Sequence, residues 1–239
     1  MKQIGVITPV PEIIETIIQN SILRQAVERE IVRFHICDLR QFGEGNYRQI
    51  DDAPFGGGSG MVMMPEPLFK ASDYLRDLMG GEDDVRVIYP SPQGVAWDHS
   101  SAEENSQVDK LIFICGHYKG IDERVLETIV THEYSIGDYV VSGGELPAMI
   151  MIDGIVRLIP GVLNTYESAM TDSFADGLLD APYYTRPRTI RGMKVPEVLL
   201  SGHHRQIKEW RQEQRERRTE KRRPDLWKNY LKKQKASEK

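Results

Sequence analysis

The chain has 239 residues, of which 40% are hydrophobic and 28% are charged, and its formal net charge is −5 at pH 7. This length predicts two domains with a sizeable core, and no apolar run approaches the roughly 20 residues that cross a bilayer. The amino terminus lacks a signal-peptide pattern, and Cys37 and Cys115 both lie in apolar runs. We therefore expect a cytoplasmic protein with two buried free thiols and no membrane segment.

Strands and helices are expected to alternate along most of the chain, which predicts an α/β fold with a mostly parallel sheet. A polar, glycine-rich loop interrupts them over residues 40–60, and a loop of this length is usually functional or disordered. The expected strands are residues 3–7, 30–39, 61–64, 85–89, 111–115 and 134–136, and the expected helices are residues 11–18, 65–79, 100–107, 121–129 and 144–158.

Glycines follow two of these strands, at Gly116 and Gly137. Glycine corners at the carboxyl ends of strands let backbone amides face a ligand, at the edge where open α/β sheets bind ligands. The chain has neither GxxxxGK[ST] nor GxGxxG after a strand, so the usual phosphate cradles are missing. The corners suit a nucleoside without phosphate, although a simple tight turn is the more common role for any single glycine.

The carboxyl-terminal part differs in composition from the remainder of the chain. Residues 163–172 form an expected linker, and a second, mostly helical domain begins at Ser173. Residues 186–239 hold 18 Lys and Arg against 7 Asp and Glu, whereas residues 1–185 hold 13 against 29. A basic end on an acidic body fits a polyanionic partner, but a solvated basic helix face would give the same counts.

Several long motifs carry a resemblance to a known family. In chain order they read DDAPFGGGSGMVM (51–63), IYPSPQG (88–94), GHYKGIDER (116–124), SIGDYVVSGGELPA (135–148), RLIPGVL (157–163) and DSFADGLLDAPYYTRP (172–187). Together they resemble the bacterial tRNA (guanine-N1-)-methyltransferases, knotted methyltransferases of the SPOUT class. The resemblance covers nearly the whole chain.

The resemblance implies a particular architecture. It predicts a SPOUT-type, mostly parallel sheet with a C-terminal trefoil knot in residues 1–162, a flexible linker over residues 163–172, and a small helical, basic, tRNA-binding domain in residues 173–239. Periodicity alone would not propose a knot, because knotted backbones are rare. The family also implies a homodimer with the active site at the subunit interface.

The implied reaction is methyl transfer from S-adenosyl-L-methionine to N1 of the guanine at position 37 of tRNA. That atom carries a proton, so the reaction needs a general base, and a cation should offset charge on O6. The resemblance assigns Asp172 as the base and Arg157 as the residue that orients it or offsets that charge. An N-cap role for Asp172 and a helix-dipole role for Arg157 are the ordinary alternatives.

The resemblance also implies binding residues. Ser59 and Gly60 would hold the target guanine, with serine where the family more often has proline. The expected methyl-donor site consists of Tyr89, Ser91, Pro92, Gly116, Ile136, Gly137, Asp138, Tyr139, Val140, Val141, Gly143, Gly144 and Pro147. Apolar members of this set would equally suit the core of a sheet.

His117 and Lys119 stand where many family members have arginine and glutamate. That glutamate is associated with a magnesium requirement, so magnesium dependence is doubtful here and no metal ligand is assigned. Two alternatives remain open: a non-catalytic RNA-binding protein, and a related knotted methyltransferase that acts on another RNA.

Overall fold

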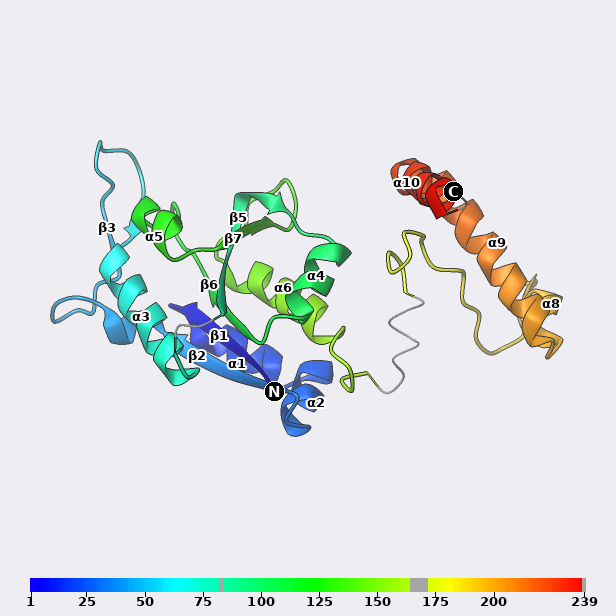
Figure 1. Ribbon diagram of the computed structural model, residues 1–239, viewed down its shortest axis with the longest axis horizontal. Coiled ribbons are helices and arrows are strands. Elements are labelled where there is room, and N and C mark those ends of the chain that lie inside the picture. Colours follow the sequence, from blue (N-terminus) through cyan, green and yellow to red (C-terminus); the bar gives the residue numbers. More distant parts are fainter. Residues whose placement is uncertain (82–83, 164–171, 238–239) are drawn as a thin grey trace. The chain divides into compact units, whose positions relative to one another are not determined.

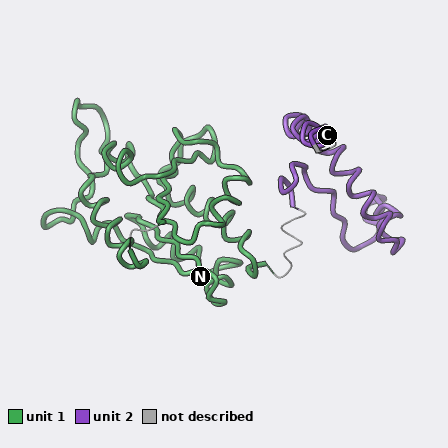
Figure 2. Tube along the Cα trace, viewed as in Figure 1, with its two compact units in different colours: residues 1–164 green, residues 165–239 purple. Residues whose placement is uncertain are grey.

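The computed structural model describes residues 1–81, 84–163 and 172–237. The chain divides into two compact units, residues 1–164 and residues 165–239 (Figure 2). The sequence had placed the end of the first domain at residue 162. Most of the expected linker, residues 164–171, lies outside the described residues. The prediction that this linker is flexible concerns the same residues and stays a prediction.

The first unit is built on a five-stranded sheet with the order β2-β1-β6-β5-β7. Every neighbouring pair in this sheet is parallel, so the predicted α/β fold with a mostly parallel sheet is confirmed. The strands are β1 (Lys2–Thr8), β2 (Val32–Asp38), β5 (Val85–Ala96), β6 (Lys110–Ile114) and β7 (His132–Ser135).

Helices cover both faces of the sheet (Figure 1), as the burial of parallel sheets requires. The helices α1 (Pro11–Ile18), α2 (Ser21–Glu28), α4 (His99–Ser106) and α6 (Glu145–Val156) lie on one face, and α3 (Pro65–Leu78), α5 (Glu123–Thr128) and the 3-10 turn η1 (Leu39–Phe42) lie on the other. Along β6, Phe113 enters the core under α6, whereas Ile112 and Ile114 enter the core under α3. The central strand therefore joins two apolar cores.

Two details differ from the expected elements, and a third agrees with expectation. Helix α2 was missed, although Leu23 and Ala26 are buried at helical spacing. The expected strand at residues 61–64 exists as β4 (Val62–Met63), but it pairs antiparallel with β3 (Asp51–Asp52), outside the main sheet. Both cysteines are free and buried, as expected.

The predicted end of a strand at Tyr89 was wrong, because β5 continues to Ala96. Its register with β7 breaks between Pro90 and Val95, since proline has no N–H for a ladder hydrogen bond. Gly94 allows the strand to resume beside β7. A Cβ there would lie 2.4 Å from the backbone nitrogen of Tyr134, so a larger residue would push the strands apart.

The second unit contains the hairpin β8 (Thr189–Ile190) and β9 (Met193–Lys194), followed by helices α8 (Glu197–Leu200), α9 (His204–Arg222) and α10 (Pro224–Ser237). Thr219 of α9 is fully buried, and its Oγ1 accepts a hydrogen bond of 2.8 Å from the Leu179 amide. Arg215 forms an ion pair with Asp176, 2.6 Å between Nη2 and Oδ1. These contacts fix the loop of residues 172–181 against α9.

Across the helices that the structure describes, none has both the length and the apolar character that crossing a membrane would take.

Removing a large side chain from the core under α6 should destabilise the first unit. We expect Phe113→Ala to lower the free energy of unfolding by about 3–5 kcal/mol, because Phe113 is fully buried. Phe55→Ala is the matched control, since Phe55 is fully exposed, and it should stay within about 0.5 kcal/mol of the parent chain. Urea denaturation followed by circular dichroism measures both. Equal stabilities of the two variants would contradict the assignment of this core.

Candidate functional site

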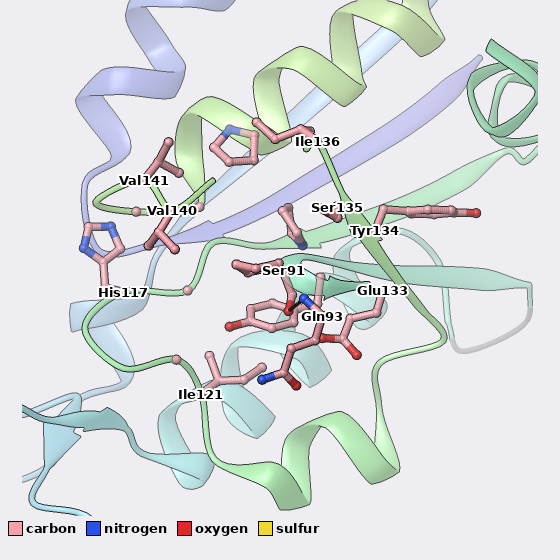
Figure 3. Close-up of a pocket in the computed structure, with 18 of the residues that line it drawn as sticks. Ser91, Gln93, His117, Ile121, Glu133, Tyr134, Ser135, Ile136, Val140 and Val141 are labelled. Atoms are coloured by element: carbon pink, nitrogen blue, oxygen red, sulfur yellow. Dashed lines mark hydrogen bonds between the residues drawn. The ribbon is translucent and has the colours of Figure 1, made fainter. Parts of the chain in front are cut away.

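A cavity of about 300 Å³ opens where β5, β6 and β7 give way to loops (Figure 3). Its walls come from residues 89–93 of β5, the loop of residues 116–121 after β6, Glu123 and Leu126 of α5, and residues 133–137 and 139–144 around the end of β7. Pro147 of α6 closes one side. This is the edge of a parallel sheet at which α/β proteins bind ligands.

Twelve of the thirteen residues expected to bind the methyl donor line this single cavity: Tyr89, Ser91, Pro92, Gly116, Ile136, Gly137, Tyr139, Val140, Val141, Gly143, Gly144 and Pro147. Asp138 is exposed and is not part of the lining. Residues from four separate stretches of sequence are thus brought together by the fold. Their role in binding stays a prediction.

The glycines of this cavity permit very close packing of backbone. Gly144 donates a 2.8 Å hydrogen bond to the Gly116 carbonyl, and a Cβ on Gly144 would lie 2.8 Å from the Cα of Cys115. A Cβ on Gly116 would lie 2.6 Å from the hydroxyl of Tyr89. Side chains at either position would therefore displace a cavity wall.

A buried polar chain connects the two glycine-bearing loops. Glu145, only 2% exposed, accepts a 2.6 Å hydrogen bond from Thr8 Oγ1, and its Oε2 lies 2.8 Å from Nε2 of His117. Burial opposes ionisation of Glu145, but the hydrogen bonds from His117, Thr8 and the helix amide outweigh it and hold its pKa below the usual 4.5. An ionised Glu145 at the start of α6 also complements the helix dipole.

The opposite side of the cavity holds a second carboxylate, on the half-buried side chain of Glu133. Glu133 pairs in register with Tyr89 across β7 and β5, so the two side chains stand on the same face of the sheet. Burial, and then the charge of Glu133, raise the pKa of the Tyr89 phenol to about 12. The Oε1 atom of Glu133 is inaccessible to solvent and has no hydrogen-bond partner among the described residues.

The predicted guanine-binding residues lie on a neighbouring loop. Gly60 packs against Lys119, since a Cβ on Gly60 would lie 2.9 Å from Cγ of that side chain. The Lys119 amide donates a 3.0 Å hydrogen bond to the Met61 carbonyl, and Lys119 itself lines the cavity. Ser59 is exposed on the same loop and does not line the cavity. The loop reaches the rim of the cavity through Gly60 and Lys119.

The predicted catalytic residues belong to different units. Arg157 is half-buried at the carboxyl end of α6 in the first unit, where its charge lowers the pKa of Asp153 against the larger, opposing effect of burial. Asp172 is in the second unit, and its backbone carbonyl accepts a hydrogen bond from the Ala175 amide. Their pairing stays a prediction.

Sequence reasoning did not assign Gln93, Glu133 or Glu145 to the site. Glu145 had a usable signal, because a glutamate directly after Gly143-Gly144 begins a helix. For Glu133 the only signal in the sequence was its position in a short strand. Its proximity to Tyr89 depends on the register between β5 and β7, which the sequence does not reveal. Within residues 1–81, 84–163 and 172–237, no three His, Cys, Asp or Glu side chains gather as metal ligands would.

Fold and site together define a class: an α/β protein with a nucleoside-sized cavity, lined in part by glycine backbone, at the carboxyl edge of its sheet. Comparison with known proteins identifies the family. The chain belongs to the family described as tRNA (Guanine-1)-methyltransferase TrmD, whose model matches residues 1–229.

Relatives that carry the name tRNA (guanine-N(1)-)-methyltransferase are similar over nearly the full chain. The protein of Brevibacillus brevis is 52% identical over 94% of this chain and 90% of its own length. That of Lacticaseibacillus paracasei is 52% identical over 95% of this chain and 87% of its own. That of Shouchella clausii is 50% identical over 95% and 92%.

The depressed pKa of Glu145 makes a testable contribution to stability. Because its pKa is lower in the folded state, this contribution is present above about pH 4.5 and is lost as the pH falls below that value. We expect Glu145→Gln to lower the free energy of unfolding by about 1.5–3 kcal/mol at pH 7. The difference from the parent chain should shrink below pH 4.5.

Urea denaturation curves recorded from pH 3 to pH 8, about one for every half pH unit, measure how this stability difference depends on pH. Glu15→Gln, at an exposed position of α1, is the control and should leave stability unchanged at every pH. A loss in Glu145→Gln that is equally large at low pH would mean that the ionised carboxylate is not the source of the stabilisation.

Proposed function

We propose that this chain transfers a methyl group from S-adenosyl-L-methionine to N1 of the guanine at position 37 of tRNA, 3′ of the anticodon. The observation that carries the proposal is the single cavity lined by twelve positions expected to bind the donor. It occurs in a chain about half identical to proteins named tRNA (guanine-N(1)-)-methyltransferases. A non-catalytic RNA-binding protein would leave this cavity unused.

The cavity has the composition that a nucleoside thioether or sulfonium compound requires. Ile136, Val141 and Pro147 supply apolar walls for a flat base, and the glycines expose backbone groups to its polar edges. S-adenosyl-L-methionine would supply the electrophilic methyl group when bound here. Glu123 and Glu133 also line the cavity, and their charges disfavour a phosphorylated nucleotide.

Proton removal from the guanine would fall to Asp172, with Arg157 orienting it or offsetting charge on O6. A carboxylate can accept the N1 proton, and a guanidinium stabilises negative charge that develops in the transition state. The two residues lie in different compact units. Binding of the tRNA would therefore bring Asp172 to the cavity. Such closure would exclude water from the reacting atoms.

We also propose a homodimer with the active site at the subunit interface. The rim of the cavity continues into exposed apolar side chains, with Val140 84%, Leu146 57% and Ile150 52% exposed. Leu146 and Ile150 are four residues apart on α6 and so share one face of the helix. A second copy of the chain would bury this face and could bring its own Asp172 to the cavity.

The trefoil knot is likewise proposed for residues 89–144. The segment after β7 is held on one side by the extension of β5, through the 2.8 Å hydrogen bond from the Trp97 amide to the Ser135 carbonyl. On the other side it is held by the bridge between His117 and Gly143. These two contacts place the segment between two loops, an arrangement that a threaded backbone would also have.

The second unit would bind the tRNA backbone. Helix α9 carries exposed arginines, among them Arg205 and Arg217, with 92% and 69% of their side chains exposed; each forms an ion pair along the helix, with Glu209 and Glu213 respectively. Exposed guanidinium groups on a helix are suited to phosphate contacts, which would make binding weaken as salt increases.

The direct test is methyl transfer to a tRNA transcript with guanines at positions 36 and 37, followed by identification of the methylated base. We expect 1-methylguanine at position 37. A transcript with adenine at position 37 is the control and should accept no methyl group. Methylation of that control, or of a ribose, would favour a related methyltransferase with another target.

Replacing the proposed base should separate catalysis from donor binding. We expect Asp172→Asn to reduce kcat at least about 100-fold, because the amide cannot accept the N1 proton. Binding of S-adenosylhomocysteine, measured by calorimetry, should change little. Asp176→Asn and Asp225→Asn are poor controls because Asp176 pairs with Arg215 and Asp225 pairs with Arg223, so Asp73→Asn, at an exposed position of α3, serves instead. Unchanged turnover in Asp172→Asn would remove this residue from the mechanism.

A methyl group added at Gly116 should distort the cavity. Its Cβ would lie 2.6 Å from the Tyr89 hydroxyl, so we expect Gly116→Ala to move the ring and weaken S-adenosylhomocysteine binding at least about 10-fold. The control is Gly154→Ala in α6, where a Cβ has ordinary contacts of 3.7 Å or more. Calorimetry measures the affinity of both variants for S-adenosylhomocysteine. Equal affinities of Gly116→Ala and Gly154→Ala would mean that the donor binds elsewhere.

A further inference from the structure

His117 lies where two parts of the proposed active site meet. It lines the cavity, with 22% of its side chain exposed, and Figure 3 shows it on the side of the cavity where Val140 and Val141 lie. Its backbone pairs with Gly143 in an antiparallel bridge. His117 thus joins the loop after β6 to the turn that precedes α6.

The imidazole of His117 is hydrogen-bonded to a buried carboxylate. Its Nε2 atom lies 2.8 Å from Oε2 and 2.9 Å from Oε1 of Glu145, whose side chain is only 3% exposed. Burial opposes ionisation of Glu145, but its hydrogen bonds keep its pKa below the usual 4.5, so it is charged at neutral pH. An ionised carboxylate only accepts hydrogen bonds, so Nε2 must carry the hydrogen and donate it. Without this donor, the buried charge would keep Thr8 as its one side-chain partner among the described residues.

The backbone next to this pair is shaped to admit it. A Cβ on Gly143 would lie 2.6 Å from Nε2 of His117 and 2.6 Å from Oε2 of Glu145. Any side chain at position 143 would therefore displace one of the two partners. Glycine at this position has a reason in the pair itself, separate from any contact of Gly143 with a ligand.

The segment of residues 116–122 carries the effect of this pair to two places. Most of the segment lines the cavity. The same segment is hydrogen-bonded to the loop of residues 59–63, because the Lys119 amide donates to the Met61 carbonyl at 3.0 Å and two further backbone hydrogen bonds join it to Met63. A shift of the segment would consequently move the cavity wall and the neighbouring loop together.

We propose that His117 is a positioning residue for binding of the methyl donor. Through its hydrogen bond to Glu145, it holds the segment of residues 116–122 where that segment forms the cavity wall and supports the loop of residues 59–63. This inference rests on the proposed function, because it assumes that the donor occupies the cavity. The imidazole acts through Glu145 and needs no contact with the donor. A wall that is already fixed raises affinity, because less conformational freedom is lost on binding.

Two substitutions separate the hydrogen bond of His117 from its bulk. His117→Leu keeps a side chain of similar size without a donor, whereas His117→Gln keeps an N–H group near the position of Nε2. We expect the dissociation constant of the full-length chain for S-adenosylhomocysteine to rise about 10-fold in His117→Leu, within the range that coupling between contacting residues produces. His117→Gln should restore most of this affinity. His99→Leu is the control and should bind like the parent chain, since His99 begins α4 and does not line the cavity.

A double-mutant cycle, measured by calorimetry, tests whether His117 acts through Glu145. Glu145→Met offers no carboxylate to the imidazole, so adding His117→Leu to it should weaken S-adenosylhomocysteine binding little further. A loss as large as in the parent chain would mean that the imidazole contacts the ligand directly, and the positioning role would be wrong. If Glu145→Met does not fold, Glu145→Gln removes the charge alone, and His117→Leu should still cost less affinity there than in the parent chain.

Stability and turnover distinguish positioning from a purely structural role. In His117→Leu the KM values for S-adenosyl-L-methionine and for tRNA should both rise, while kcat changes less. A folded His117→Leu that unfolds at a lower temperature but binds S-adenosylhomocysteine like the parent chain would overturn the inference. A parent chain that binds S-adenosylhomocysteine but methylates no guanine would refute the proposed function alone, and the binding comparison would still decide the role of His117. A parent chain that binds no S-adenosylhomocysteine would overturn both.

Discussion

The site depends on direct contact between two stretches of backbone. The 2.8 Å hydrogen bond from the Gly144 amide to the Gly116 carbonyl holds the loop after β6 against the start of α6. A Cβ on Gly144 would lie 2.8 Å from the Cα of Cys115, so this approach of the two backbones requires glycine at position 144. Next to it, Glu145 binds Thr8 and His117, so β1, the loop after β6 and α6 share one buried polar anchor. The cavity walls take their positions from this junction.

Much of this arrangement could be anticipated from the sequence. Apolar runs located the strands of the main sheet, and glycines at the strand ends located the edge where the cavity opens, because both signals are local. The remainder depends on contacts between distant residues. The continuation of β5 to Ala96 requires Gly94 to pass close to Tyr134. Likewise, the opposition of Tyr89 and Glu133 follows from a strand register that no local pattern encodes.

The charges of the chain are divided between its two units in a way that suits two different tasks. The first unit is acidic, and its cavity includes Glu123 and Glu133, which favours a ligand with amino or cationic groups. The second unit presents basic side chains on α9, which favours a polyanion. One protein could thus hold a small cationic molecule and a nucleic acid without the two competing for the same surface.

The two thiols have a practical consequence. Burial raises the pKa of Cys37 to about 12 and that of Cys115 well above its usual value, and the thiolate is the form that alkylating reagents attack. Both cysteines belong to the cores of the first unit, Cys37 on the α3 side and Cys115 on the α6 side. The rate of alkylation in the native protein would consequently measure how often the sheet opens on each face, without any added probe.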